Sequence, residues 1–153
     1  MRFIIFLLIN FGALALGAIF MGESPAENEW YKKLNQAPWT PPGWVFGFAW
    51  TFIMVTFSLY MSRIFINFNG VLLRKLMVLF SLQVILNVLW NPVFFQWHLV
   101  IIALIILIVL FIILVFIHLD FADNKRFNSL LILPYFLWLI VALSLNLYIT
   151  IFN

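Results

Sequence analysis

Amide side chains recur at one spacing inside an apolar stretch of this sequence. Gln83, Asn87 and Asn91 are four residues apart, which puts them on one face of a helix. An amide in hydrocarbon is costly unless it is hydrogen-bonded, so this face must point into a helix bundle. Two interpretations remain open for the row. It can supply hydrogen bonds between helices, or it can line a ligand cavity.

Aromatic side chains gather in two other segments. The stretch "APWTPPGWVFGFAW", Ala37 to Trp50, contains three prolines, two glycines and three tryptophans. It opens a helical face that carries Phe46, Trp50, Met54 and Phe57. Farther along, Trp138, Ala142 and Asn146 follow at steps of four, and the small alanine leaves room for a neighbouring helix or a ligand. Each aromatic face is explained either by packing or by contact with a flat ligand.

Residue sets typical of catalysis are absent from the sequence. There is no cysteine, which excludes thiol catalysis and thiolate metal sites. His98 and His118 bracket an apolar run at opposite membrane faces, so they cannot share one metal ion. The sequence therefore predicts a binding protein with no obligatory cofactor rather than a conventional enzyme.

Composition decides what must position these residues. The chain has 153 residues, 67% of them hydrophobic and 8% charged, whereas a soluble domain has roughly a quarter charged residues. Five apolar runs are each long enough to cross a bilayer as a helix. We expect an all-α membrane protein, a bundle of five transmembrane helices in a single domain, with spans at about 3–21, 43–66, 72–95, 99–119 and 129–152.

The first run also has features of a secretory signal peptide. Arg2 precedes an apolar stretch that ends in the small residues of "ALALGA", as in a cleavable signal. The run is longer than the usual apolar region of a signal peptide. Its removal would also expose the faces of the other helices to lipid, and we therefore interpret it as the first span.

The connection at 22–42 is the only long one and should form a cover over one end of the bundle. "SPAE" resembles a helix start, with Ser24 as N-cap, Pro25 in the first turn and Glu27 closing a capping box. Trp30, Tyr31 and Leu34 would share one side of a short amphipathic helix. Such a helix serves equally as an interfacial anchor or as a lid.

Basic residues predict the orientation. Six lie on one predicted side and two, Lys32 and Lys33, on the other; the six are Arg2, Arg63, Arg74, Lys75, Lys125 and Arg126. The positive-inside rule then puts the N-terminus in the cytoplasm, and the first loop and the C-terminus outside. Because these residues lie in short connections between spans, they indicate a topology rather than a nucleic-acid partner.

Three blocks carry a resemblance to a known family. They are "WYKKLNQAPWTPPGWVFGFAW" (Trp30 to Trp50), "QVILNVLWNPVFF" (Gln83 to Phe95) and "LLILPYFLWLIVALSLN" (Leu130 to Asn146). In this order and spacing the chain resembles the TspO/MBR family, the tryptophan-rich sensory proteins. The resemblance implies a five-helix bundle, often a homodimer, with a ligand pocket beneath the first loop. It implies binding of tetrapyrroles such as protoporphyrin IX, of sterols, and of isoquinoline or benzodiazepine compounds.

The resemblance also implies a set of ligand-binding residues. Trp39 and Trp44 would lie at the mouth of the pocket. With the aromatic face and the polar row, the expected set is Tyr31, Trp39, Pro41, Trp44, Phe46, Trp50, Gln83, Asn87, Trp90, Phe94, Trp138, Ala142, Leu145 and Asn146. The family's link to light- and oxygen-dependent porphyrin breakdown gives an alternative, in which Trp50 and Trp138 are catalytic. A cholesterol motif is in doubt, because no basic residue follows Tyr148.

Overall fold

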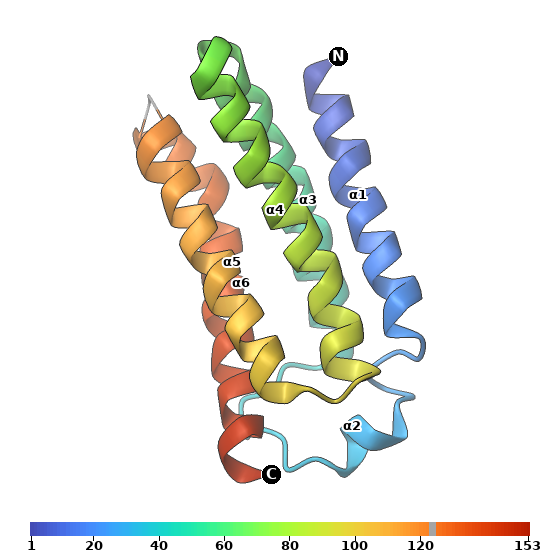
Figure 1. The fold of residues 1–153 in the computed structure, drawn as a ribbon. Helices are drawn as coiled ribbons and strands as arrows, with labels where there is room; N and C mark the ends of the chain where they lie inside the picture. The colour runs from blue at the N-terminus through green and yellow to red at the C-terminus, as the bar shows by residue number, and fades with distance from the viewer. Residues whose placement is uncertain (123–124) are drawn as a thin grey trace.

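The computed structural model describes residues 1–122 and 125–153, and the described part is all-α. A five-residue helix lies in the first loop, and a single 3₁₀ turn, η1, follows the second long helix (Figure 1). The elements are α1 (Arg2–Met21), α2 (Glu29–Lys33), α3 (Gly43–Ile64), η1 (Phe65–Asn67), α4 (Gly70–Phe95), α5 (Val100–Phe121) and α6 (Lys125–Phe152).

The long helices form a closed ring. α1 packs against α3 and α4, α6 packs against α3 and α5, and α4 and α5 complete the circle. All five are long and apolar enough to cross a membrane, which confirms the predicted fold class of a multi-pass helical membrane protein. Their ends lie within two residues of the predicted ones, except that α6 begins at Lys125 rather than near 129. Residues 125–128, two of them basic, extend this helix at its N-terminal end beyond the apolar run.

The first loop differs from the prediction in where its helix begins. Only Glu29–Lys33 is helical, and its N-cap is Asn28, whose side chain accepts a hydrogen bond of 2.9 Å from the backbone N–H of Tyr31. Ser24 instead closes a turn, with its Oγ 2.7 Å from Glu27 Oε2. Asn28 is itself a favoured N-cap, and it is the cap that the chain uses. Lys32 lies 2.9 Å from the Glu29 carboxylate and lowers the pKa of that group.

The same loop is fastened to α6 at two points. The backbone N–H of Asn35 donates to Asn153 Oδ1 at 2.8 Å, and Asn153 Nδ2 donates back to the Asn35 carbonyl at 3.3 Å. The indole N–H of Trp39 donates to Ser144 Oγ at 3.1 Å. The loop therefore lies across the end of the bundle where α6 finishes (Figure 1).

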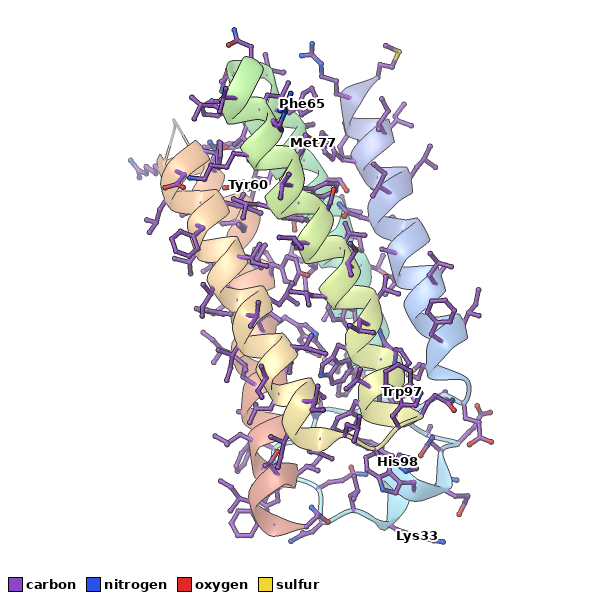
Figure 2. All side chains as sticks on the ribbon, viewed as in Figure 1. Lys33, Tyr60, Phe65, Met77, Trp97 and His98 are labelled. Atoms are coloured by element: carbon purple, nitrogen blue, oxygen red, sulfur yellow. The ribbon has the colours of Figure 1, made fainter. Side chains whose placement is uncertain are left out.

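The opposite end of the bundle carries polar contacts between neighbouring helices. Lys75 on α4 forms a 2.8 Å ion pair with Asp120 on α5. The ring nitrogens of His118 lie 3.3 Å from Tyr60 Oη and 3.0 Å from Ser129 Oγ, which joins α3, α5 and α6. Figure 2 shows Tyr60 at this end and Trp97, His98 and Lys33 at the other. The first loop and the basic connections thus lie at opposite ends.

Close approach of α1 to α4 depends on Gly17. A Cβ atom at this position would lie 2.6 Å from Asn91 Nδ2 and 3.4 Å from Asn91 Cγ. We predict that Gly17→Leu lowers the thermal unfolding midpoint of the detergent-purified protein, because overpacking typically costs about 1–3 kcal/mol. Gly12→Leu is the matched control on the same helix, since a Cβ there meets nothing within 4 Å. Equal midpoints for the two variants would contradict this account of the α1–α4 contact.

Candidate functional site

Tyr135 is the centre of a polar cluster between α4 and α6. Its hydroxyl oxygen accepts hydrogen bonds from Gln83 Nε2 at 2.8 Å and from Asn87 Nδ2 at 3.0 Å. Asn91, the third amide of the row, instead donates to the Asn87 backbone carbonyl at 3.2 Å. Two of the three amides therefore link helices, as the first interpretation of the row requires. Gln83 Oε1 remains buried without a hydrogen-bond partner among the described residues.

Aromatic rings from α3 and α6 pack beside this cluster. The Trp138 ring lies 5.2 Å from Phe46 and 6.5 Å from Trp50, measured between ring centroids, and both pairs are edge-to-face. Trp50 also lies 6.0 Å from Tyr135. Because α3 and α6 are neighbours in the ring of helices, the faces that the sequence put on separate spans meet in one interior wall. Ala142 lies one turn after Trp138, half-buried against the same core.

A second aromatic group lies beneath the first loop. Trp90 stacks on Phe94 at 5.2 Å, and Tyr31 of α2 lies 6.1 Å from Phe94 and 5.5 Å from Phe95. Burial in this contact raises the pKa of the Tyr31 phenol. The short helix of the loop therefore covers the end of α4 with an aromatic side chain.

Unsatisfied polar atoms mark the interior near this end. Both side-chain amide atoms of Asn146 are buried and lack a hydrogen-bond partner among the described residues, as does Trp90 Nε1. Asn146 and its neighbour Leu145 are buried on α6, exposed by 2% and 7%. A buried polar group without a partner costs about 1–3 kcal/mol. A ligand or water that supplied a donor and acceptors here would recover this energy.

The other expected residues lie at the loop end of the bundle. Pro41 is half-buried just before α3, and the Trp44 side chain is exposed. Trp39 is also exposed but fixed, through Ser144 and an edge-to-face contact with Tyr148 at 5.4 Å. None of the three has a ring contact with Trp50 or Trp138 among the described aromatic pairs.

Sequence reasoning gave no ligand-binding role to two residues that the geometry makes prominent. Tyr135 could have been found by spacing, because it precedes Trp138 by three residues and so shares its face. His98, whose ring stacks on Trp30 with centroids 4.1 Å apart, has no periodic signal because it lies in a turn.

The side chains gathered at this site are mainly aromatic and amide groups. The described residues contain no group of three or more histidine, cysteine, aspartate or glutamate side chains that could hold a metal ion. What the interior offers is flat aromatic surface from three helices, two amides fixed through one phenol, and unpaired donors and acceptors. This combination suits a ligand with a large planar apolar body and a few polar atoms.

Comparison with known proteins agrees with this description. The chain is 28% identical to protein CrtK of Rhodobacter capsulatus over 137 residues, 86% of this chain and 80% of that protein. It is 30% identical to the tryptophan-rich sensory protein of Cereibacter sphaeroides over 120 residues, with 78% and 73% covered. It is 31% identical to the tryptophan-rich protein TspO of Archaeoglobus fulgidus over 139 residues, with 90% and 87% covered. Because the family's sequence model also matches residues 3–152, nearly the whole length of the bundle, this chain belongs to the TspO/MBR family.

Proposed function

We propose that this protein is a membrane receptor or carrier with a sensory role that binds planar hydrophobic ligands, foremost porphyrins. The sensory role is supported by relatives that carry it in their names. The single observation that carries the ligand class is the interior wall of Phe46, Trp50 and Trp138 beside the Tyr135 cluster. Offset or edge-to-face aromatic contacts contribute about 0.5–1.5 kcal/mol each beyond burial.

The polar edge of a porphyrin matches the unpaired polar atoms of this interior. Its macrocycle is flat and aromatic, and its polar edge could satisfy the unpaired Trp90 Nε1 and the Asn146 amide. Smaller aromatic compounds of the isoquinoline or benzodiazepine type would use the same wall with fewer polar contacts. Sterols have no aromatic face, so the wall gives them no comparable contact.

A porphyrin titration tests this proposal. Protoporphyrin IX would be added in the dark to the purified protein in detergent, with tryptophan fluorescence and porphyrin absorbance as readouts. We expect saturable quenching that is absent from empty micelles and from an unrelated helical membrane protein in the same detergent. Non-saturable quenching that matches these controls would contradict porphyrin binding.

The alternative function is a light- and oxygen-dependent breakdown of the bound porphyrin. The observation that favours it is a run of oxidisable side chains, in which the Trp50 ring lies 6.0 Å from Tyr135 and 6.5 Å from Trp138, measured between ring centroids. An indole could donate an electron to the excited porphyrin, with molecular oxygen as the final oxidant. Illumination of the complex in air should then consume porphyrin, and Trp138→Phe should slow this while the dark affinity is kept. Loss of porphyrin at the same rate without protein would exclude the enzymatic role.

The orientation proposed for this function puts the first loop outside the cytoplasm. The basic connections and the first loop lie at opposite ends of the bundle. The end with the basic connections carries six basic residues and the loop end carries two, which favours a cytoplasmic location for the basic connections. A cysteine at Asn35 should therefore react with a membrane-impermeant thiol reagent in intact cells, whereas one at Asn69 should not. Both side chains are exposed. The reverse labelling pattern would overturn the orientation.

We also propose a homodimer. The structure reduces the number of small residues that could lie at its interface. Small residues let two helices approach closely, and the sequence offers Ala13, Gly17, Gly43 and Gly47. Of these four, Ala13 and Gly17 are buried within the bundle. Gly43 and Gly47 on α3 are open, since a Cβ atom added at either position would meet nothing within 4 Å, and both remain available to a second copy. The mass of the protein in mild detergent and in nanodiscs should be that of a dimer, and Gly47→Leu should shift it toward the monomer. A monomer mass in both media would refute the dimer.

A further inference from the structure

A groove of about 630 Å³ lies on the surface next to α2, separate from the interior aromatic wall. Its walls come from α2, from the start of α5 and from the end of α6, and they are mainly apolar. They include Trp30, Leu34, Ile102 and Ile149, with Asn153 at one edge. His98 also lines the groove, in the turn between α4 and α5 beside α2 (Figure 2).

His98 is held in an unusual conformation. Its φ of 54° is the only positive φ of a non-glycine residue in the described parts of the chain. Such a conformation costs about 1–3 kcal/mol and persists where the surroundings enforce it. Here a hydrogen bond of 3.0 Å from Leu99 N to the Val93 carbonyl closes the turn. The imidazole then stacks on Trp30 at an interplanar angle of 18°, which fixes the plane of the ring.

The ring nitrogens of His98 are available to a ligand. Neither has a hydrogen-bond partner in the described residues, and the side chain is exposed at the groove. Stacking on Trp30 uses the face of the imidazole, whereas its lone pair lies in the ring plane and stays open. The only other histidine, His118, has both nitrogens turned toward Tyr60 and Ser129 at the far end of the bundle.

A single histidine cannot hold a bare metal ion, which needs about three or four protein ligands. The described residues offer no such group. A metal that already carries four ligands in a macrocycle needs only one more, and histidine is the usual axial ligand of such an iron. The groove adds apolar walls for a macrocycle. Lys33, three residues along α2 from Trp30, is an exposed cation at the same end of the bundle (Figure 2).

We propose that this groove is a second site, which binds an iron tetrapyrrole with His98 as the axial ligand of the iron. The inference rests on the proposed function for its class of ligand, but on different residues for its site. Iron-bound and metal-free porphyrins would thus be distinguished by place: the first at the His98 groove, the second at the interior aromatic wall.

The test is a titration of ferric protoporphyrin IX into the detergent-purified protein, followed by its Soret band and by electron paramagnetic resonance. We expect the wild-type protein to give a histidine-ligated spectrum that empty micelles do not give. His98→Phe keeps a ring to stack on Trp30 but removes the lone pair. Mutation of a residue that only hydrogen-bonds a metal-ligating histidine lowers metal affinity roughly 10–100-fold. Removal of the histidine itself should therefore weaken binding of the iron porphyrin at least about tenfold.

His98→Gly is the second variant, because glycine adopts a positive φ without strain and so keeps the turn. Loss of the ligated spectrum in both variants supports the site, and its retention in either overturns it. Metal-free protoporphyrin IX should bind both variants as it binds the wild type. If metal-free porphyrin binds the wild type and the iron form shows no His98-dependent spectrum, only this inference fails. If metal-free porphyrin does not bind at all, the proposed function fails, whatever the iron form does.

Discussion

Replacement of Ala142 by threonine should weaken porphyrin binding about five- to a hundredfold and leave the helical fold intact, because overpacking typically costs about 1–3 kcal/mol and 1.4 kcal/mol is tenfold in affinity. Ala142 lies one turn from Trp138 on α6 and is half-buried against the main core. A branched polar side chain there would crowd the Trp138 indole, which belongs to the proposed ligand-binding wall. This cost appears as a loss of affinity if the crowding destabilises the porphyrin-bound protein and not the free protein.

Three further variants show whether this loss belongs to the proposed pocket. Trp50→Ala removes one ring of the wall and should also weaken binding. Trp138→Phe keeps a ring, so most of the affinity should remain while quenching of tryptophan fluorescence by the porphyrin decreases. Trp97→Phe is the control, since Trp97 is 58% exposed and lies outside the wall. Dissociation constants within twofold of the parent for Ala142→Thr and Trp50→Ala, with a larger change for Trp97→Phe, would show that the pocket is elsewhere.

The fold class could be predicted from the sequence because the length and hydrophobicity of the apolar runs determine it. In lipid a spanning segment must satisfy its own backbone hydrogen bonds, so five long apolar runs can only be five helices. The α5 segment, Val100–Phe121, is an example, since its apolar run is uninterrupted over most of its length. The start of α2 was predicted wrongly because Ser24 and Asn28 are both good N-caps. Local sequence does not decide between two adequate caps, and packing of Tyr31 against α4 favours the later one.

The candidate site was only partly predictable, for a different reason. Periodicity identifies which residues share a face of one helix, and it identified the faces of Gln83, Trp50 and Trp138. It does not say which faces meet, because that depends on the order of helices around the ring. The meeting of α4 with α6 through Tyr135 is a contact across 52 and 48 residues of sequence. The setting of His98 was not predictable, because it depends on a strained turn and on a groove built by three separate elements.

Replacement of Tyr135 by phenylalanine should destabilise the bundle more than removal of one hydroxyl group suggests. The oxygen accepts from two amides, so its loss leaves both without an acceptor. Hydrogen bonds between transmembrane helices average only about 0.6 kcal/mol, because the unfolded chain in the membrane also finds partners. A buried group left unsatisfied costs about 1–3 kcal/mol. Gln83 is 1% exposed and cannot turn to water. For this residue we therefore expect the cost of a buried unsatisfied group, about 1–3 kcal/mol.

The measurement is the midpoint of unfolding, by heat and by titration with a denaturing detergent, with porphyrin affinity determined on the same samples. Tyr148→Phe is the matched control, since it removes a phenol from the same helix that has no hydrogen bond among the described residues and contacts only Trp39 and Phe152 by its ring. Equal midpoints for the two variants would show that the amide cluster is not a stabilising contact.

If Tyr135→Phe lowers the midpoint, its effect on porphyrin affinity indicates how the site is built. A matched loss of affinity means that the α4–α6 link holds the aromatic wall in position. Unchanged affinity means that Trp50 and Trp138 are positioned by α3 and α6 alone.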